Sequence, residues 1–416
     1  MLQHCAQGFE SCHEAAHLEV ELYLVRNLPG QVSSMRPSLG EHADRPAARP
    51  EVDQQARRAF DIVLATLDGH NVAVSQQSMS VSPFADLLVF SRDSCREKPV
   101  LVVAPLAGAF PVLLRDLVLG LLPYRAPVAV TDWFDARYVP QAAGPFGLED
   151  NILTVLDMIR SLGPSPHVVA VCQGAVAALA ATALLSADES EAVPCSLTLV
   201  AGPIDPLANQ TGAVRLARSH PLKWFAEKAI ESVPVGYPGE GRLVYPKALQ
   251  TRTLMAYFGR HIARGGELFW KLMDDDGEDP VRFPFVSLAM PQMDIPAEFF
   301  LGNIRSVFHN RDLSCGCLQV AGRQIDLRTI DRTALMTLEG EEDDIVGPGQ
   351  TRAAHALCPA IPARKHEHIL IPRGGHFSLF HGAICRSRVI PAIAEFIMRA
   401  ERSSPGAGRR LRERAN

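Results

Sequence analysis

The sequence is poor in several features that would point to particular classes of protein. Its 416 residues contain no apolar run near the roughly 18 residues that a membrane-spanning helix needs. There is no basic excess, because the formal net charge is −5, so nothing indicates a nucleic-acid partner. The first residues show neither a basic region nor an apolar stretch, and we therefore expect no secretory signal.

Disulfide and metal patterns are also missing. The nine cysteines are odd in number and irregularly spaced, which favours reduced thiols in a cytosolic protein over a disulfide framework. Cys315 and Cys317 are too close in sequence for a usual zinc pair. A metal set could be drawn from Cys5, Cys12, His13 and His17, but we expect their segment to be poorly ordered and therefore expect no metal there. We expect neither a metal nor a cofactor.

What the sequence does contain is a globular composition with an alternating pattern. It is 47% hydrophobic and 21% charged, which allows a large core. Short apolar runs typical of buried strands alternate with stretches of helical periodicity. Strands are expected at 71–75, 87–91, 99–104, 127–131, 167–171, 196–200, 334–338 and 368–371, and helices at 110–122, 148–162, 174–186, 350–357 and 384–400. This order predicts an α/β fold with a mostly parallel sheet covered on both faces.

The alternation divides the chain into regions. Residues 1–58 are expected to be a poorly ordered lead segment, and residues 401–416 a disordered tail. The core is expected to comprise residues 59–202 and 331–400. Residues 203–330 interrupt it between the sixth and seventh strands and are rich in aromatics, so we expect them to form a cap over the carboxyl edge of the sheet.

Cys172 stands at a junction that favours catalysis. The apolar run His167–Val171 leads into Cys172, Gln173 and Gly174, and an alanine-rich helical run follows. This is the layout of a nucleophile elbow, the sharp strand-to-helix turn of α/β-hydrolases, with cysteine in place of serine. A buried cysteine at a strand end is the alternative. The flanking small residues Ala170 and Gly174 favour the nucleophile.

A thiol nucleophile needs a base and an acid that orients the base. Asp343 follows the strand at 334–338, and His376 follows the strand at 368–371. Both therefore lie at the same sheet edge as Cys172, in the chain order nucleophile, acid, histidine. We predict a Cys172–His376–Asp343 triad. Three rivals stay open, two for the acid and one for the base: Asp344, Asp205 and His381.

The remaining site residues follow from the same topology. An oxyanion hole should use the backbone N–H of Gln173 and a second N–H from the loop after the third strand, with Leu106 or Ala107 as donor. Asp132 and Trp133 follow the fourth strand and are predicted to bind substrate. The alternative for this pair is a helix cap and a packed aromatic.

Several stretches together resemble the intracellular polyhydroxyalkanoate depolymerases, of the poly(3-hydroxybutyrate) type that uses cysteine. The similarity runs from about residue 60 to 400 and is carried by 102–108, 131–137, 171–173, 202–205, 340–345, 349–355, 375–377 and 380–382. The resemblance implies an α/β-hydrolase that cleaves stored polyester through an acyl-enzyme, with a triad at Cys172, Asp343 and His376.

The resemblance also implies a partner and a location. The expected partner is the surface of a polymer granule in the cytoplasm, and the cap aromatics Trp224 and Trp270 are the first candidates for docking on it. Two other functions stay open, namely a polyhydroxyalkanoate synthase-like acyltransferase and a granule-surface protein without turnover. The sequence leaves the side-chain preference, the acyl acceptor (water or CoA) and the oligomeric state open.

Overall fold

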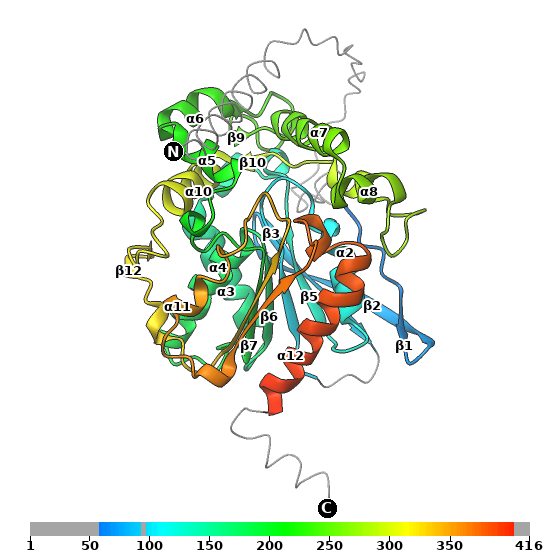
Figure 1. Ribbon diagram of the computed structural model, residues 1–416. Helices are drawn as coiled ribbons and strands as arrows, with labels where there is room; N and C mark the ends of the chain where they lie inside the picture. The colour runs from blue at the N-terminus through cyan, green and yellow to red at the C-terminus, as the bar shows by residue number, and fades with distance from the viewer. Residues whose placement is uncertain (1–57, 93–96, 403–416) are drawn as a thin grey trace, which may run out of the picture.

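The computed structural model describes residues 58–92 and 97–402 (Figure 1). The expectations for residues 1–57 and 403–416, including the candidate metal set at Cys5, Cys12, His13 and His17, lie outside these ranges. Of the helices within them, none combines the length and apolarity that a bilayer crossing requires.

One nine-stranded sheet forms the centre of the molecule. Its strands, in spatial order, are β1 (Leu64–Leu67), β2 (His70–Ser82), β3 (Ala85–Arg92), β5 (Val128–Trp133), β4 (Val100–Val103), β6 (His167–Val171), β7 (Ser196–Val200), β13 (Ala334–Gly340) and β14 (His366–Ile371). The strands from β5 to β14 run parallel, whereas β1, β2 and β3 pair antiparallel. The predicted α/β-hydrolase fold is confirmed.

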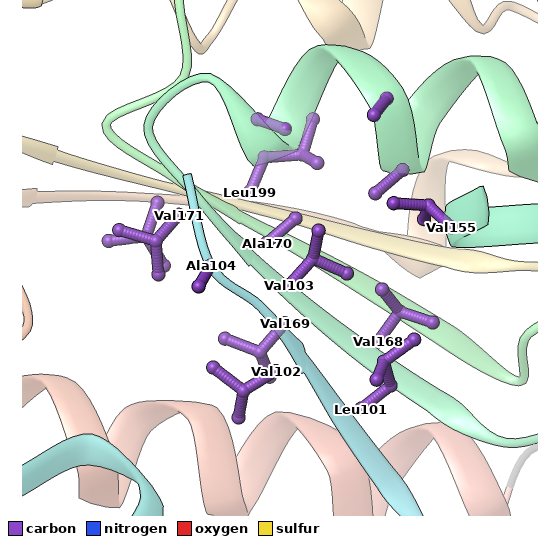
Figure 2. Packing of buried hydrophobic residues seen from close by; sticks show 14 of the residues in the cluster. Leu101, Val102, Val103, Ala104, Val155, Val168, Val169, Ala170, Val171 and Leu199 are labelled. Carbon is purple, nitrogen blue, oxygen red and sulfur yellow. The ribbon is translucent and has the colours of Figure 1, made fainter. Parts of the chain in front are cut away.

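Helices cover both faces of this sheet (Figure 1). On one face α3 (Leu148–Ser161) packs against α4 (Gly174–Ala187), and on the other α2 (Arg115–Leu121) packs against α12 (Ile390–Arg402). Every residue of β4 and β6 is buried as a result. Figure 2 shows side chains of these two strands, such as Val103 and Ala170, packed in the core. Such double-sided burial explains the unbroken apolar runs in the sequence.

Some boundaries differ from the predicted ones. The helix expected at 384–400 starts as a π-helix, Cys385–Val389, before α12. The helix expected at 350–357 is only α11 (Ala354–Leu357), because turns occupy the residues before it. β2 runs for 13 residues instead of the five expected, and β1 was not predicted. β2 is largely exposed and polar, so no apolar pattern marked its length.

Most of the residues between β7 and β13, from α5 to α10, lie over one edge of the sheet (Figure 1). Their main elements are α5 (Gly212–Ser219), α6 (Leu222–Ala229), β8 (Glu231–Ser232), β9 (Leu243–Tyr245), α7 (Lys247–Arg264), α8 (Glu267–Asp274), α9 (Phe285–Ala289), β10 (Ile295–Pro296) and α10 (Ala297–Asn303). Strands β10, β9 and β8 form a small sheet of their own. The stretch after α10 packs instead beside the sheet, where β11 (Gln319–Val320) contacts α3 and the 3₁₀ helix η7 (Leu327–Thr329) contacts α4. We call residues 203–330 the cap.

Candidate active site

Cys172 occupies a sharp turn between β6 and α4. Its φ is +52°, in the left-handed region that residues other than glycine rarely adopt. Its N–H donates to the carbonyl oxygen of Val200 at 2.8 Å, which fixes the turn against the neighbouring strand. Backbone strain of this kind persists where the surrounding structure enforces it, and it is concentrated at functional sites.

The turn closes only because small residues surround it. A Cβ atom added to Gly174 would lie 2.7 Å from the carbonyl oxygen of Val103. One added to Gly202 would lie 2.3 Å from Cβ of Ala175. Neither position has room for a larger side chain, so the close packing of α4 on β4 and on the loop after β7 depends on these glycines.

His376 and Asp343 meet at the same sheet edge. Nδ1 of His376 lies 2.8 Å from Oδ2 of Asp343, and both side chains are almost completely buried. The second carboxylate oxygen of Asp343 accepts the N–H groups of Ile345 and Val346 at 2.9 and 2.8 Å. These bonds hold the carboxylate rigidly toward the imidazole and leave Nε2 of His376 for another partner.

Cys172 is close enough to His376 to influence its ring. Burial alone would lower the pKa of His376, but the charges and hydrogen bonds of Asp343 and Cys172 raise it well above its usual value. The structure therefore brings together the three residues that the sequence predicted as a triad.

Two glycines set the distance between the loops that carry Asp343 and His376. A Cβ added to Gly340 would lie 2.3 Å from the carbonyl oxygen of Gly374. That same oxygen accepts the N–H of Glu342 at 2.9 Å. The turn before His376 contains a left-handed residue, Arg373 with φ +57°, rather than a left-handed glycine. The glycines thus serve close backbone approach.

The rival residues have other partners. Asp344 accepts hydrogen bonds from Tyr257 Oη at 2.7 Å and pairs with His261 Nε2 at 3.0 Å, both on α7. Asp205 forms two bonds of 2.9 Å with Arg311. His381 is fully buried, and burial followed by the charge of Lys271 lowers its pKa to about 4. Within the described part of the chain, none of these three side chains forms a hydrogen bond with His376.

A cavity of about 190 Å³ lies beside His376, between the core loops and the cap. Its walls include Tyr257, His261, Arg264, Glu267, Asp344 and His376. Burial raises the pKa of Glu267 to about 7, and the neighbouring carboxylates Asp276 and Glu342 add to the rise against the opposing Lys271. No sequence motif distinguishes Tyr257, His261 and Glu267 from the rest of the aromatic-rich cap, so their place in the site was not predicted.

The backbone around the elbow offers free donors. Within the described part of the chain, the N–H groups of Gln173, Leu106 and Ala107 donate to no backbone acceptor. The loop that carries Leu106 and Ala107 also contains Gly108, with φ +103°, whose carbonyl oxygen accepts the N–H of Met293 from the cap at 2.7 Å. The arrangement is compatible with the predicted oxyanion donors, which remain a prediction.

Asp132 and Trp133 lie in the interior instead of on the cavity wall. They are 2% and 1% exposed. Trp133 Nε1 donates to the carbonyl oxygen of Ala104 at 2.8 Å, at the base of the loop that carries Leu106. Trp133 is therefore a packed aromatic, which was the alternative to a substrate-binding role. A direct contact with substrate would require an exposed side chain, and neither Asp132 nor Trp133 is exposed.

The residues 58–92 and 97–402 contain no group of three or more His, Cys, Asp or Glu side chains arranged to hold a metal ion. Cys315 and Cys317 are both exposed free thiols.

Comparison with known proteins relates part of the chain to one family. Residues 201–401 match the family model described as PHB de-polymerase C-terminus. The match covers just under half of the chain. The matched region includes Asp343, His376 and the whole cap, whereas Cys172 lies before it. No curated protein matches the chain.

Solved structures give more distant similarities. They include a monoacylglycerol lipase from Paleococcus ferrophilus (13% identity, 79% of this chain and 99% of the other, TM-score 0.43) and an alpha/beta hydrolase fold protein from Nakamurella multipartita (17%, 78% and 99%, 0.41). A hydrolase from Pseudomonas aeruginosa PA01 is 16% identical over 78% of this chain and 98% of the other, with a TM-score of 0.45. At these levels the similarities say nothing about substrate.

Proposed function

We propose that this chain hydrolyses the ester bonds of stored poly(3-hydroxybutyrate), with Cys172 as nucleophile, His376 as base and Asp343 as orienting acid. The observation that carries the proposal is the position of His376. One ring nitrogen bonds Asp343 at 2.8 Å while the imidazole also interacts with the thiol on the strained elbow. The match of residues 201–401 to the PHB depolymerase family supports the choice of polymer.

The first half of the reaction forms an acyl-enzyme. Sγ of Cys172 attacks the ester carbonyl carbon, and Nε2 of His376 takes the thiol proton. Collapse of the tetrahedral intermediate breaks the carbon–oxygen bond of the ester. His376 returns the proton to the departing hydroxyl end of the polymer, and a thioester remains on Cys172. Asp343 stabilises the imidazolium while it carries the proton.

The second half regenerates the enzyme. A water molecule gives a proton to His376 and attacks the thioester carbonyl, and the thiolate then leaves and regains that proton. In both halves the negative charge on the carbonyl oxygen needs donors. Gln173 N–H, together with the N–H of Leu106 or Ala107, supplies them in our proposal, since such preorganised donors commonly contribute about 2.7–4 kcal/mol.

The test is incubation with amorphous native polymer granules, followed by measurement of released 3-hydroxy acids. We expect 3-hydroxybutyrate and its oligomers from the wild-type chain. In parallel, addition of a hydroxyacyl-CoA tests for release of free CoA, which would indicate the synthase-like acyltransferase. Binding to granules with no product from either substrate would indicate a granule-surface protein without turnover. A granule-bound protein in the cytoplasm is the location that the proposal requires.

A further inference from the structure

Helix α7 has an outward face of unusual character. Its exposed positions Ala248, Arg252, Met255, Gly259 and Ile262 recur at intervals of three and four residues and so form one stripe. Met255 and Ile262 are 58% and 51% exposed, and a side chain at Gly259 would meet no atom within 4 Å. Apart from Arg252, the positions of this stripe are apolar or glycine. Surface helices normally place polar residues on such a face, so this mostly apolar stripe indicates a contact surface.

The neighbouring helix α8 also carries exposed apolar side chains. Trp270 and Met273 are three residues apart and therefore share a face of α8, with exposures of 61% and 64%. α7 and α8 contact one another. We call Met255, Ile262, Trp270 and Met273 the outer patch. Trp224, the other docking candidate from the sequence, stacks on His220 with ring centroids 4.0 Å apart and packs against Phe225, so it is only partly exposed, unlike Trp270.

The charge of α7 narrows the choice of partner. Its 18 residues include one lysine, three arginines and one histidine but no aspartate or glutamate. A polyester presents methyl and methylene groups, ester oxygens that only accept hydrogen bonds, and carboxylate chain ends. Lys247 and His261 are paired with Asp135 and Asp344. An apolar stripe on a helix that carries no carboxylate to repel the chain ends complements that surface. A second copy of the chain would instead place the same cationic helix against itself across a symmetric interface.

The position of α7 connects the outer patch to the candidate active site. Tyr257 and His261 lie about 180° around the helix from the stripe, at 100° per residue. Both line the cavity beside His376 and bond to Asp344, the neighbour of Asp343. One helix, about 10 Å across, thus separates the outer patch from the cavity.

We propose that the outer patch of α7 and α8 is the surface that this chain lays against water-insoluble polyester. The inference rests on the proposed function for the identity of the substrate. Contact through the patch would hold the cavity about one helix diameter from the polymer surface.

The experiment compares two double variants with equal numbers of apolar-to-polar changes. M255Q/I262Q alters the stripe. V63Q/L64Q alters two exposed residues, 58% and 51% exposed, at and beside β1, which lies at the far end of the sheet from β14. Sedimentation with protein-free amorphous poly(3-hydroxybutyrate) particles measures binding, in a Cys172→Ala background that prevents digestion. Turnover of the particles and of soluble p-nitrophenyl butyrate is measured with Cys172 intact.

We expect M255Q/I262Q to lose about tenfold or more in particle binding and turnover, since two buried side chains of this size are worth roughly that much. Hydrolysis of p-nitrophenyl butyrate should stay within about twofold. V63Q/L64Q should match the wild type in every assay. Trp270→Gln should act in the same direction as M255Q/I262Q.

Three results would overturn the proposal. Unchanged particle binding by M255Q/I262Q would exclude the stripe, and binding to phosphatidylglycerol vesicles but not to polymer would assign the patch to a lipid surface. A shift of M255Q/I262Q from dimer to monomer in sedimentation velocity would assign it to a second copy. A different result would contradict the proposed function and leave the docking proposal intact. In that case the wild type would bind particles and cleave the soluble ester but release no 3-hydroxy acid.

Discussion

Asp343 and Asp344 are consecutive in the chain, yet their carboxylates bond to different parts of the molecule. Asp343 pairs with His376 of the core at 2.8 Å. Asp344 pairs with His261 of α7 at 3.0 Å and accepts the hydroxyl of Tyr257 at 2.7 Å. Burial would raise the pKa of Asp344, but these two hydrogen bonds lower it overall. The turn that carries both residues therefore has two roles. Through Asp343 it orients the proposed base His376, and through Asp344 it connects helix α7 of the cap to the core.

This division predicts different kinetic effects of the two isosteric variants. Asp343→Asn should lower kcat by about three to four orders of magnitude, because an amide cannot stabilise the imidazolium. Asp344→Asn should mainly raise KM for polymer, because it loosens Tyr257 and His261 beside the cavity. Steady-state kinetics on a soluble ester and on particles separate the two effects. A larger loss of kcat in Asp344→Asn would move the acid to Asp344.

A second prediction concerns the thiol. Cys172→Ala should abolish ester cleavage, with a loss of several orders of magnitude, while circular dichroism and thermal unfolding stay close to the wild type. Iodoacetamide should inactivate the wild type. The matched control is Cys315→Ala/Cys317→Ala, which removes two exposed thiols and should leave both activity and the rate of inactivation unchanged. Substantial turnover by Cys172→Ala would remove the nucleophile from the proposal.

Glu267 gives a prediction of stability against pH. Its pKa of about 7 exceeds the value of about 4.3 in an unfolded chain, so the folded state prefers the protonated acid. Its contribution is fully present below about pH 4.3 and is lost as pH rises through about 7. Glu267→Gln should therefore gain stability relative to the wild type between pH 4.5 and 8, by on the order of 2 kcal/mol after screening.

Urea unfolding at pH 4.5 and pH 8 measures this difference, and comparison of variant with wild type cancels the other titrating groups. The exposed Glu231→Gln is the matched control and should show no pH-dependent difference. Equal stability gains at both pH values would show that the Glu267 carboxylate does not titrate between them.

A substitution at Trp133, the last residue of β5, tests whether this side chain contacts substrate or supports the loop that carries Leu106 and Ala107. Trp133→Phe leaves the buried carbonyl of Ala104 without its donor and opens space in the core, which should cost about 2–4 kcal/mol. We expect lower kcat, because the loop that carries Leu106 and Ala107 loses its anchor, and little change in KM. A large rise in KM with an unchanged unfolding free energy would restore the predicted substrate contact.

The sequence by itself determined the fold and the identity of the triad candidates. Buried parallel strands such as β4 and β6 must be apolar along their whole length, and that run is visible without a structure. The order of Cys172, Asp343 and His376, each directly after a strand, follows from the shared carboxyl edge of a parallel sheet. Local sequence thus sufficed wherever the chain's own periodicity fixed the position of a side chain.

Tertiary structure decided what depends on contacts between distant segments. Asp343 and Asp344 have the same chemistry in the same turn, and only the positions of His376 and α7 distinguish them. Burial in the folded chain raises the pKa of Glu267 to about 7, and the indole N–H of Trp133 finds its acceptor at Ala104, 29 residues away in sequence. The outward stripe of α7 follows in the same way, since helical periodicity gives a stripe but only packing decides which side faces solvent.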